Sequence, residues 1–122
     1  MTSNVVIESP YAGSTVEGNT EYARMCLKDS LGKNEAPIAS HLLYTQVLDD
    51  TKEKDRELGI NAGLSWLNNA DYQIFYVDKG LSKGMLFALV FNMQQIGAPI
   101  QFRALNTKNQ CLADFLNNLI KG

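Results

Sequence analysis

The stretch Asp71-Tyr-Gln-Ile-Phe-Tyr-Val-Asp78 is the clearest structural signal in this chain of 122 residues. It is rich in aromatic and β-branched side chains, and Lys79-Gly80 follows it as a turn. This pattern is typical of a β-strand that ends abruptly at a surface turn. We therefore take these residues as the first fixed element of the fold.

The segment after this strand predicts a helix and then another strand. Ser82 is positioned to start the helix, whose body Met85–Met93 is apolar nearly all the way round, as in a helix buried on both faces. Gly97 is expected to end the helix, and Pro99 to prevent its continuation. The next predicted strand is Ile100–Arg103.

The N-terminal part predicts the same alternation. Asn4–Ser9 is a short apolar run that a proline ends, which suits a buried first strand. After a loop over Tyr11–Gly18, Asn19 or Thr20 is expected to cap a helix that ends at Gly32. Pairs of apolar residues three and four positions apart support this helix: Tyr22, Ala23, Cys26, Leu27 and Leu31.

The middle of the chain predicts a weaker strand over Pro37–Ser40 and then a stretch long enough to cover a site. Asp50 or Thr51 should cap a helix that continues to about Asn69.

This middle helix has an expected inward face of Leu58, Ala62 and Trp66. Gly59 and Gly63 each cost a helix about 1 kcal/mol relative to alanine. We therefore expect another backbone to approach them closely, from the sheet or from a second subunit.

A closing amphipathic helix is predicted over Asn109–Ile120, with an apolar face of Leu112, Phe115, Leu116 and Leu119. Strands that alternate with helices indicate right-handed crossovers and a parallel sheet covered on both sides. We therefore expect one α/β domain over residues 1–122. It should be a Rossmann-like or flavodoxin-like three-layer fold with four to five parallel strands in the order 2-1-3-4.

Composition narrows the classes of partner. The formal net charge is −2, without a basic cluster, so we expect no nucleic acid and no membrane as partner. The N-terminus resembles no signal peptide, which predicts a cytoplasmic protein. Cys26 and Cys111 lie far apart and His41 is the single histidine, so we expect no metal site, and we expect no cofactor.

In parallel sheets of this kind, ligands bind beyond the carboxyl ends of the strands. The residues that follow the predicted strands should therefore meet in one pocket. The expected ligand-binding set is Ser9, Pro10, Tyr11, Ser40, His41, Asp78, Gly80, Ser82, Gly84, Met85 and Arg103.

Several of these residues have two interpretations. The turn Asp78–Met85 either receives an anion or sugar hydroxyl on free backbone N–H groups, or only lets the chain turn into a helix. His41 is either a pocket residue or general base, or a structural group, and Tyr11 either stacks on a base or packs over the sheet edge. Either Asp49 or Asp50 reaches the ligand, or both belong to a solvated first turn.

Three segments resemble one family. Ser9-Pro-Tyr-Ala-Gly13, Ser40-His-Leu-Leu-Tyr-Thr-Gln46, and Gly80-Leu-Ser-Lys-Gly-Met85 with Gly97-Ala-Pro-Ile100 are similar to the nucleoside 2-deoxyribosyltransferase-like families. The similarity is strongest to short uncharacterised members that bacteriophages encode, and it spans roughly residues 4 to 105.

The resemblance implies a nucleophilic glutamate four residues after Gly84, but Ala88 stands there. Alanine cannot form a glycosyl-enzyme intermediate. The first expectation is therefore binding of a nucleoside- or nucleotide-derived molecule, which in a phage would sequester a nucleotide-type immune signal in the host cytoplasm. The alternative is a hydrolase or transferase of N-glycosidic bonds that uses Asp78, His41 or both.

The apolar helix from Ser82 also predicts assembly. Leu86, Leu89, Val90 and Met93 lie on one side of it and Phe87 and Phe91 on another, so one face would remain in water. Burial against a second copy would stabilise a homodimer or larger homo-oligomer. The resemblance to the transferases, whose sites lie near subunit boundaries, implies that Arg103 or Tyr44 of a neighbour would complete each pocket. In the alternative, the closing helix covers Phe87 and Phe91 within one chain.

Overall fold

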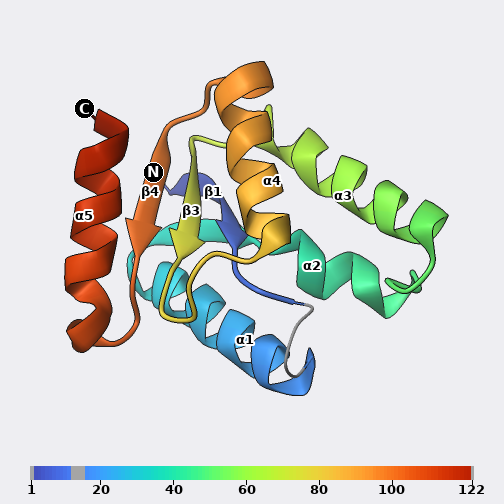
Figure 1. Ribbon diagram of the computed structural model, residues 1–122, viewed down its shortest axis with the longest axis horizontal. Helices are drawn as coiled ribbons and strands as arrows, with labels where there is room; N and C mark the ends of the chain where they lie inside the picture. Colours follow the sequence, from blue (N-terminus) through green and yellow to red (C-terminus); the bar gives the residue numbers. More distant parts are fainter. Residues whose placement is uncertain (1, 12–15, 122) are drawn as a thin grey trace.

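The computed structural model describes residues 2–11 and 16–121. Its sheet has four parallel strands in the order β2-β1-β3-β4 (Figure 1). This confirms the predicted α/β class and strand order, with the lower of the two expected strand numbers. The strands are β1 (Ser3–Glu8), β2 (Glu35–Ile38), β3 (Tyr72–Tyr76) and β4 (Ile100–Arg103).

Helices connect the strands and cover both faces of the sheet (Figure 1). The described helices and helical turns are α1 (Val16–Gly32), α2 (Ser40–Leu43), η1 (Tyr44–Gln46), α3 (Glu53–Leu67), α4 (Lys83–Phe91), the π-helical turn η2 (Asn92–Ile96), η3 (Thr107–Asn109) and α5 (Gln110–Lys121). None of the helices in the described ranges is long and apolar enough to cross a membrane.

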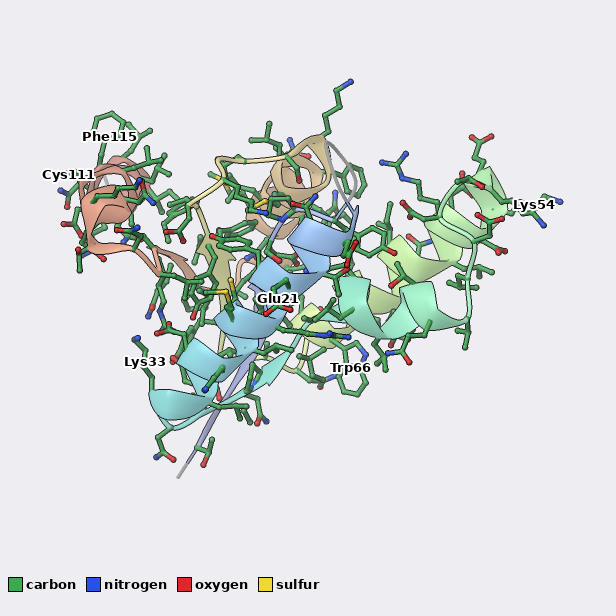
Figure 2. All side chains as sticks on the ribbon, turned by 90° about the horizontal axis from the view of Figure 1, so that it is seen from below. Glu21, Lys33, Lys54, Trp66, Cys111 and Phe115 are labelled. Atoms are coloured by element: carbon green, nitrogen blue, oxygen red, sulfur yellow. The ribbon has the colours of Figure 1, made fainter. Side chains whose placement is uncertain are left out.

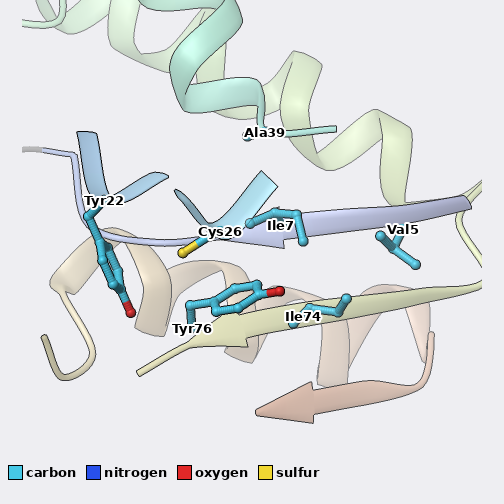
Figure 3. Packing of buried hydrophobic residues seen from close by; sticks show 7 residues of the cluster. All are labelled: Val5, Ile7, Tyr22, Cys26, Ala39, Ile74 and Tyr76. Atoms are coloured by element: carbon cyan, nitrogen blue, oxygen red, sulfur yellow. The ribbon is translucent and has the colours of Figure 1, made fainter. Parts of the chain in front are cut away.

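Alternation along β3 divides the core into two clusters. Ile74 and Tyr76 face α1 and pack with Val5 and Ile7 of β1 (Figure 3). The next cluster forms on the opposite face, beneath α3 and α4, from Leu64, Phe75, Val77, Met85, Ala88, Phe102 and Ala113. The sheet is therefore buried on both faces, as the apolar strands require.

The starts of α1 and β2 differ from the sequence-based expectation. Helix α1 begins at Val16, before the predicted caps. Asn19 is buried inside the helix, and its Nδ2 donates to the carbonyl of Tyr11. Residues 12–15 of the predicted loop lie outside the described residues. Strand β2 starts earlier, at Glu35, because Asn34 adopts a left-handed conformation (φ 62°) that turns the chain directly after α1.

The N-terminus of α3 also differs. Lys52 precedes the first turn, and the predicted cap on Asp50 or Thr51 does not form. Instead, Asp49 accepts a hydrogen bond from the backbone N–H of Thr51 in a local turn, and this turn delays the start of the helix.

The predicted inward face of α3 was wrong. Leu58 and Trp66 are exposed, whereas Gly63, Leu64 and Leu67 are buried. The cause is α2, which packs on Gly63 so closely that a Cβ there would lie 2.4 Å from Oγ of Ser40.

Within the described residues, the structure does not show the approach of another backbone that was predicted for the two glycines of α3, because side-chain atoms of the same chain lie against them. Gly63 faces Ser40, and Gly59 faces Leu48 and Tyr44. Neither the sheet nor a second subunit is needed to explain these glycines.

Helix α4 is buried on one face only, so the expectation of burial on both faces was wrong for a single chain. Met85 and Ala88 are buried, while most of the large apolar side chains are exposed: Leu86, Phe87, Val90 and Met93. The closing helix does not cover Phe87, which is 53% exposed. A left-handed Gly97 (φ 80°) ends η2 as predicted.

Helix α5 lies beside β4 at the edge of the sheet (Figure 1). Asn117 donates from Nδ2 to the carbonyl of Phe102 and accepts from its N–H at Oδ1, at 2.9 and 2.7 Å. The side chain thereby replaces a fifth strand at an open edge. Ala113 is buried, whereas the opposite side of α5, with Cys111 and Phe115, points away from the rest of the molecule (Figure 2).

Candidate functional site

A pocket lies where the carboxyl end of β1 meets α2, α3 and the first turn of α4. It holds about 160 Å³ of space for the centres of water molecules. One water needs roughly 10–15 Å³ by this measure, so the pocket has room for a ligand of many heavy atoms.

Six of the predicted ligand-binding residues line this pocket: Ser9, Tyr11, Ser40, His41, Gly84 and Met85. They come from three distant parts of the chain, which the crossover topology brings together. The other predicted residues do not line it: Pro10, Asp78, Gly80, Ser82 and Arg103. The remaining lining residues are Glu8, Tyr44, Thr45, Leu48, Asp50, Asp55, Arg56, Gly59, Ile60, Gly63, Leu64, Phe87 and Ala88.

Ser9 and His41 form a hydrogen-bonded pair within the pocket. Ser9 Oγ lies 2.7 Å from Nε2 of His41, while Nδ1 of the same ring is enclosed and has no partner in the described part of the chain. Burial lowers the pKa of His41 to about 4. The ring is therefore neutral near pH 7, and it can orient a polar ligand but carries no positive charge there.

Asp78 has a structural environment outside the pocket lining. Its carboxylate accepts hydrogen bonds from the hydroxyl of Tyr22, the backbone N–H groups of Leu105 and Asn106, and Nδ2 of Asn109, all within 3.0 Å. Burial alone would raise the pKa of Asp78, but these hydrogen bonds together lower it. The carboxylate thus ties the end of β3 to the turn after β4.

Arg103 is also engaged away from the pocket. Its guanidinium forms a bidentate ion pair with Glu35, with Nη1···Oε1 at 2.7 Å and Nη2···Oε2 at 2.6 Å. Tyr72 and Ser30 donate to the same carboxylate. Burial opposes ionisation of Glu35, but these donors lower its pKa to about 2. The proposed contribution of Arg103 to a neighbour's pocket conflicts with this pairing, and Tyr44 lines the pocket of its own chain.

The sequence left two interpretations of the turn between β3 and α4: a ligand-binding turn, or a turn that only leads the chain into the helix. The structure contains features of both. Gly80 has a φ of 79°, which only glycine adopts readily, and Ser82 accepts from the N–H of Met85 at 3.2 Å as the helix cap. These residues shape the turn. Gly84, two residues further on, lines the pocket, and a Cβ there would meet only Oγ of Ser82, at an ordinary contact distance of 3.9 Å.

Sequence reasoning missed Glu8. This residue ends β1, lines the pocket, and accepts a hydrogen bond at Oε2 from Nε2 of Gln73 at 2.9 Å. Burial raises the pKa of Glu8 to about 7, against the opposing effect of that hydrogen bond. A signal was present: a carboxylate directly after Val5-Val6-Ile7 lies at the carboxyl edge of a buried strand, where ligands bind.

No three His, Cys, Asp or Glu side chains within the described ranges gather closely enough to hold a metal ion. Asp50, but not Asp49, reaches the pocket lining.

Residues 3–103 match the model of a family described as Domain of unknown function (DUF7768). The chain belongs to the DUF7768 family. No sequence among the curated proteins matches this DUF7768 chain.

A similar fold occurs in the 2-deoxyribosyltransferase from the psychrotolerant bacterium Bacillus psychrosaccharolyticus. The TM-score is 0.59 at 15% sequence identity, over 86% of this chain and 74% of that one. The DUF7768 chain therefore has a nucleoside deoxyribosyltransferase-like fold, as the sequence motifs indicated.

Ala88 of this DUF7768 protein lines the pocket from the buried side of α4. The position at which the family resemblance implies a nucleophile thus faces the ligand space, but carries only a methyl group. The carboxylates that line the pocket come instead from β1, from the segment before α3 and from α3 itself: Glu8, Asp50 and Asp55.

Proposed function

We propose that this pocket binds a nucleoside- or nucleotide-derived small molecule. The observation that carries the proposal is the convergence of Ser9, Tyr11, His41 and Gly84 on one cavity at the strand ends. The deoxyribosyltransferase-like fold supports the same class of ligand. The position of the pocket also fits, because ligands of such sheets bind at this edge.

The lining offers partners for each part of such a ligand. Tyr11 and Tyr44 present aromatic surface against which a base would stack. The Ser9–His41 pair offers hydrogen bonds to a sugar hydroxyl. A phosphate would lie between Gly84, in the first turn of α4, and Arg56 of α3, where helix dipole and guanidinium both attract an anion.

The biological role belongs to the same proposal. The resemblance of the Ser40–Gln46 motif to short phage-encoded relatives supports a protein that sequesters a nucleotide-type immune signal in the host cytoplasm. Ala88 in place of a nucleophile fits a role in holding a ligand, and we expect no transfer of deoxyribose between bases.

We also propose that the chain forms a homodimer. The exposed apolar face of α4 supports this, with Leu86, Phe87 and Val90 each 45% or more exposed. Burying such a patch against a second copy stabilises the assembly by about 25 cal/mol per Å² of apolar area.

The alternative function is cleavage of an N-glycosidic bond. Of the two groups that the sequence offered for this chemistry, Asp78 is held outside the pocket lining and His41 is neutral. The specific observation in favour of an enzyme is Glu8, whose role is developed below.

Ligand recovery tests the binding proposal. The purified chain is denatured, and released small molecules are identified by mass spectrometry; we expect a nucleoside or nucleotide derivative, or the base and sugar that come from it. Calorimetry then measures its affinity for the wild type and for Gly84→Leu, whose larger side chain would occupy part of the pocket beside the helix terminus. Failure to recover or bind any nucleoside derivative, or unchanged affinity in Gly84→Leu, would contradict the proposed site.

A further inference from the structure

Glu8 is connected to the protein interior by a chain of oriented amides. The N–H of Ala98 donates to Oδ1 of Asn92 at 2.8 Å, and because a backbone N–H can only donate, the orientation of the Asn92 amide is fixed. Nδ2 of Asn92 then donates to Oε1 of Gln73 at 2.8 Å. The Gln73 amide is oriented by this contact, so its Nε2 faces Glu8 and donates a hydrogen bond to the carboxyl group.

This relay determines where a proton on Glu8 resides. Gln73 and Asn92 are fully buried, so the relay is rigid and shielded from water. Oε2 of Glu8 receives the hydrogen bond from Gln73, and the proton of the neutral acid therefore belongs on Oε1. The carboxyl group lines the pocket, so its proton is available to a ligand.

Burial keeps both the neutral and the ionised form of Glu8 accessible near neutral pH. Burial raises its pKa to about 7, which is the range in which one group both donates and accepts protons efficiently. The other ionisable or charged residues that line the pocket are Tyr11, His41 of α2, Tyr44 of η1, Asp50, and Asp55 and Arg56 of α3. His41 is neutral at this pH.

We propose that Glu8 is the catalytic acid and base for hydrolysis of the N-glycosidic bond of a nucleoside or nucleotide in this pocket. The inference rests on the proposed ligand class. Glu8 reaches the pocket from β1, whereas Ala88 faces it from α4, so the carboxyl group lies on a different element from the one that the family resemblance implies.

The reaction is balanced with water as the second substrate. Protonated Glu8 transfers its proton to a ring nitrogen of the base that is not bonded to C1′. At the same time the bond between C1′ and the base breaks, and its electron pair remains on the nitrogen that was bonded to C1′. A water oxygen forms the new bond to C1′ and releases a proton to the Glu8 carboxylate. Base and free sugar leave, Glu8 is restored, and nothing is oxidised or reduced.

The test uses the full chain with adenosine, 2′-deoxyadenosine, cytidine and adenosine monophosphate as separate probes. Chromatography measures release of free base between about pH 5 and 9, and saturation-transfer NMR measures binding in parallel. The test variant is Glu8→Gln, which keeps the shape and can still accept from Gln73. The matched control is Glu21→Gln, an exposed carboxylate on α1 outside the pocket lining (Figure 2).

We expect the wild type and Glu21→Gln to release base, at a rate that falls above about pH 7 as Glu8 loses its proton. Glu8→Gln should be slower by roughly 100- to 10,000-fold while still binding the probe. Binding without base release by the wild type, or release by Glu8→Gln at the wild-type rate, would overturn the role of Glu8 and leave ligand binding intact. Absence of both binding and release would contradict the proposed function itself.

Discussion

The hydroxyl of Ser9 and Nε2 of His41 lie 2.7 Å apart, although 32 positions separate the two residues in the sequence. The contact joins the end of β1 to the start of α2 and fixes the orientation of a buried imidazole. Because that imidazole is held neutral, its protonation is coupled to folding.

His41→Gln should remove a pH dependence of stability. The pKa of His41 is about 4 in the folded chain, against an ordinary value of 6.5. Between these values the unfolded chain binds more protons, so the contribution of His41 is fully present above about pH 6.5 and is lost as the pH falls towards 4. The loss reaches up to about 3 kcal/mol across this range.

Urea denaturation of the wild type and His41→Gln at several pH values in this window measures the effect. The titration of Glu8 changes the stability of both proteins equally. The difference between their free energies of unfolding therefore reports the contribution of His41 alone. A difference that stays constant with pH would show that the imidazole is not held neutral.

Glu8→Gln should remove a pH dependence of stability whose sign is opposite to that of His41. The pKa of Glu8 is raised from 4.5 to about 7 in the folded chain, so the folded state binds more protons in this range. The stabilising contribution of the carboxyl group is fully present below about pH 4.5 and is lost as the pH rises through 7, by roughly 2 to 3 kcal/mol.

Thermal or urea unfolding of both proteins at the two ends of this range tests the prediction without any ligand. Glu21→Gln serves again as the exposed control and should follow the wild type. A wild-type profile parallel to that of Glu8→Gln would mean that the pKa of Glu8 is ordinary.

Gly63→Ala should destabilise the chain by roughly 1 to 3 kcal/mol, because the new Cβ would lie 2.4 Å from Oγ and 2.9 Å from Cβ of Ser40. Adding Ser40→Gly to this variant should recover much of the loss. Gly32→Ala is the matched control, since nothing lies within 4 Å of a Cβ there. Equal unfolding midpoints for the two alanine variants would contradict the close packing of α2 on α3.

Asn117→Ala should destabilise the chain by about 1 to 3 kcal/mol and promote aggregation. The substitution removes both hydrogen bonds to Phe102 and exposes the edge of β4. The adjacent exposed residue supplies the control, Asn118→Ala, which should behave as the wild type. Denaturation and turbidity measurements would reject the prediction if the two variants could not be told apart.

Light scattering at micromolar concentration tests assembly. We expect twice the chain mass of 13.5 kDa for the wild type, and the monomer mass for the double variant Leu86→Glu/Val90→Glu, which charges the exposed face of α4. A wild-type mass near 13.5 kDa would exclude the dimer.

Much of the fold could be predicted because the sequence of β3 and of the helix after it is compatible with few sheet topologies. A strand with an aromatic and β-branched pattern, followed by a crossover helix, constrains both strand direction and neighbour order. The orientation of α3 could not be predicted in this way. Ile60, Leu64 and Leu67 compete with Leu58 and Trp66 as the apolar face, and only the contact at Gly63 decides between them.

The pocket lining could be predicted where it depends on which residues follow the strands, as for Ser9, His41 and Gly84. The environment of Asp78 depends on backbone N–H groups of Leu105 and Asn106, whose approach no local pattern encodes. Glu8 differs from Asp78, because its position at the end of a buried strand was visible in the sequence.

The ion pair between Arg103 and Glu35 joins β4 to β2, the two outermost strands of the sheet. Its members are 68 positions apart, so the contact closes a loop of more than half the chain. Such a long-range contact slows folding and forms only when both halves of the polypeptide have come together. We therefore expect the amides of β1 and β3 beneath it to exchange with solvent deuterium only when the whole sheet opens in a single event.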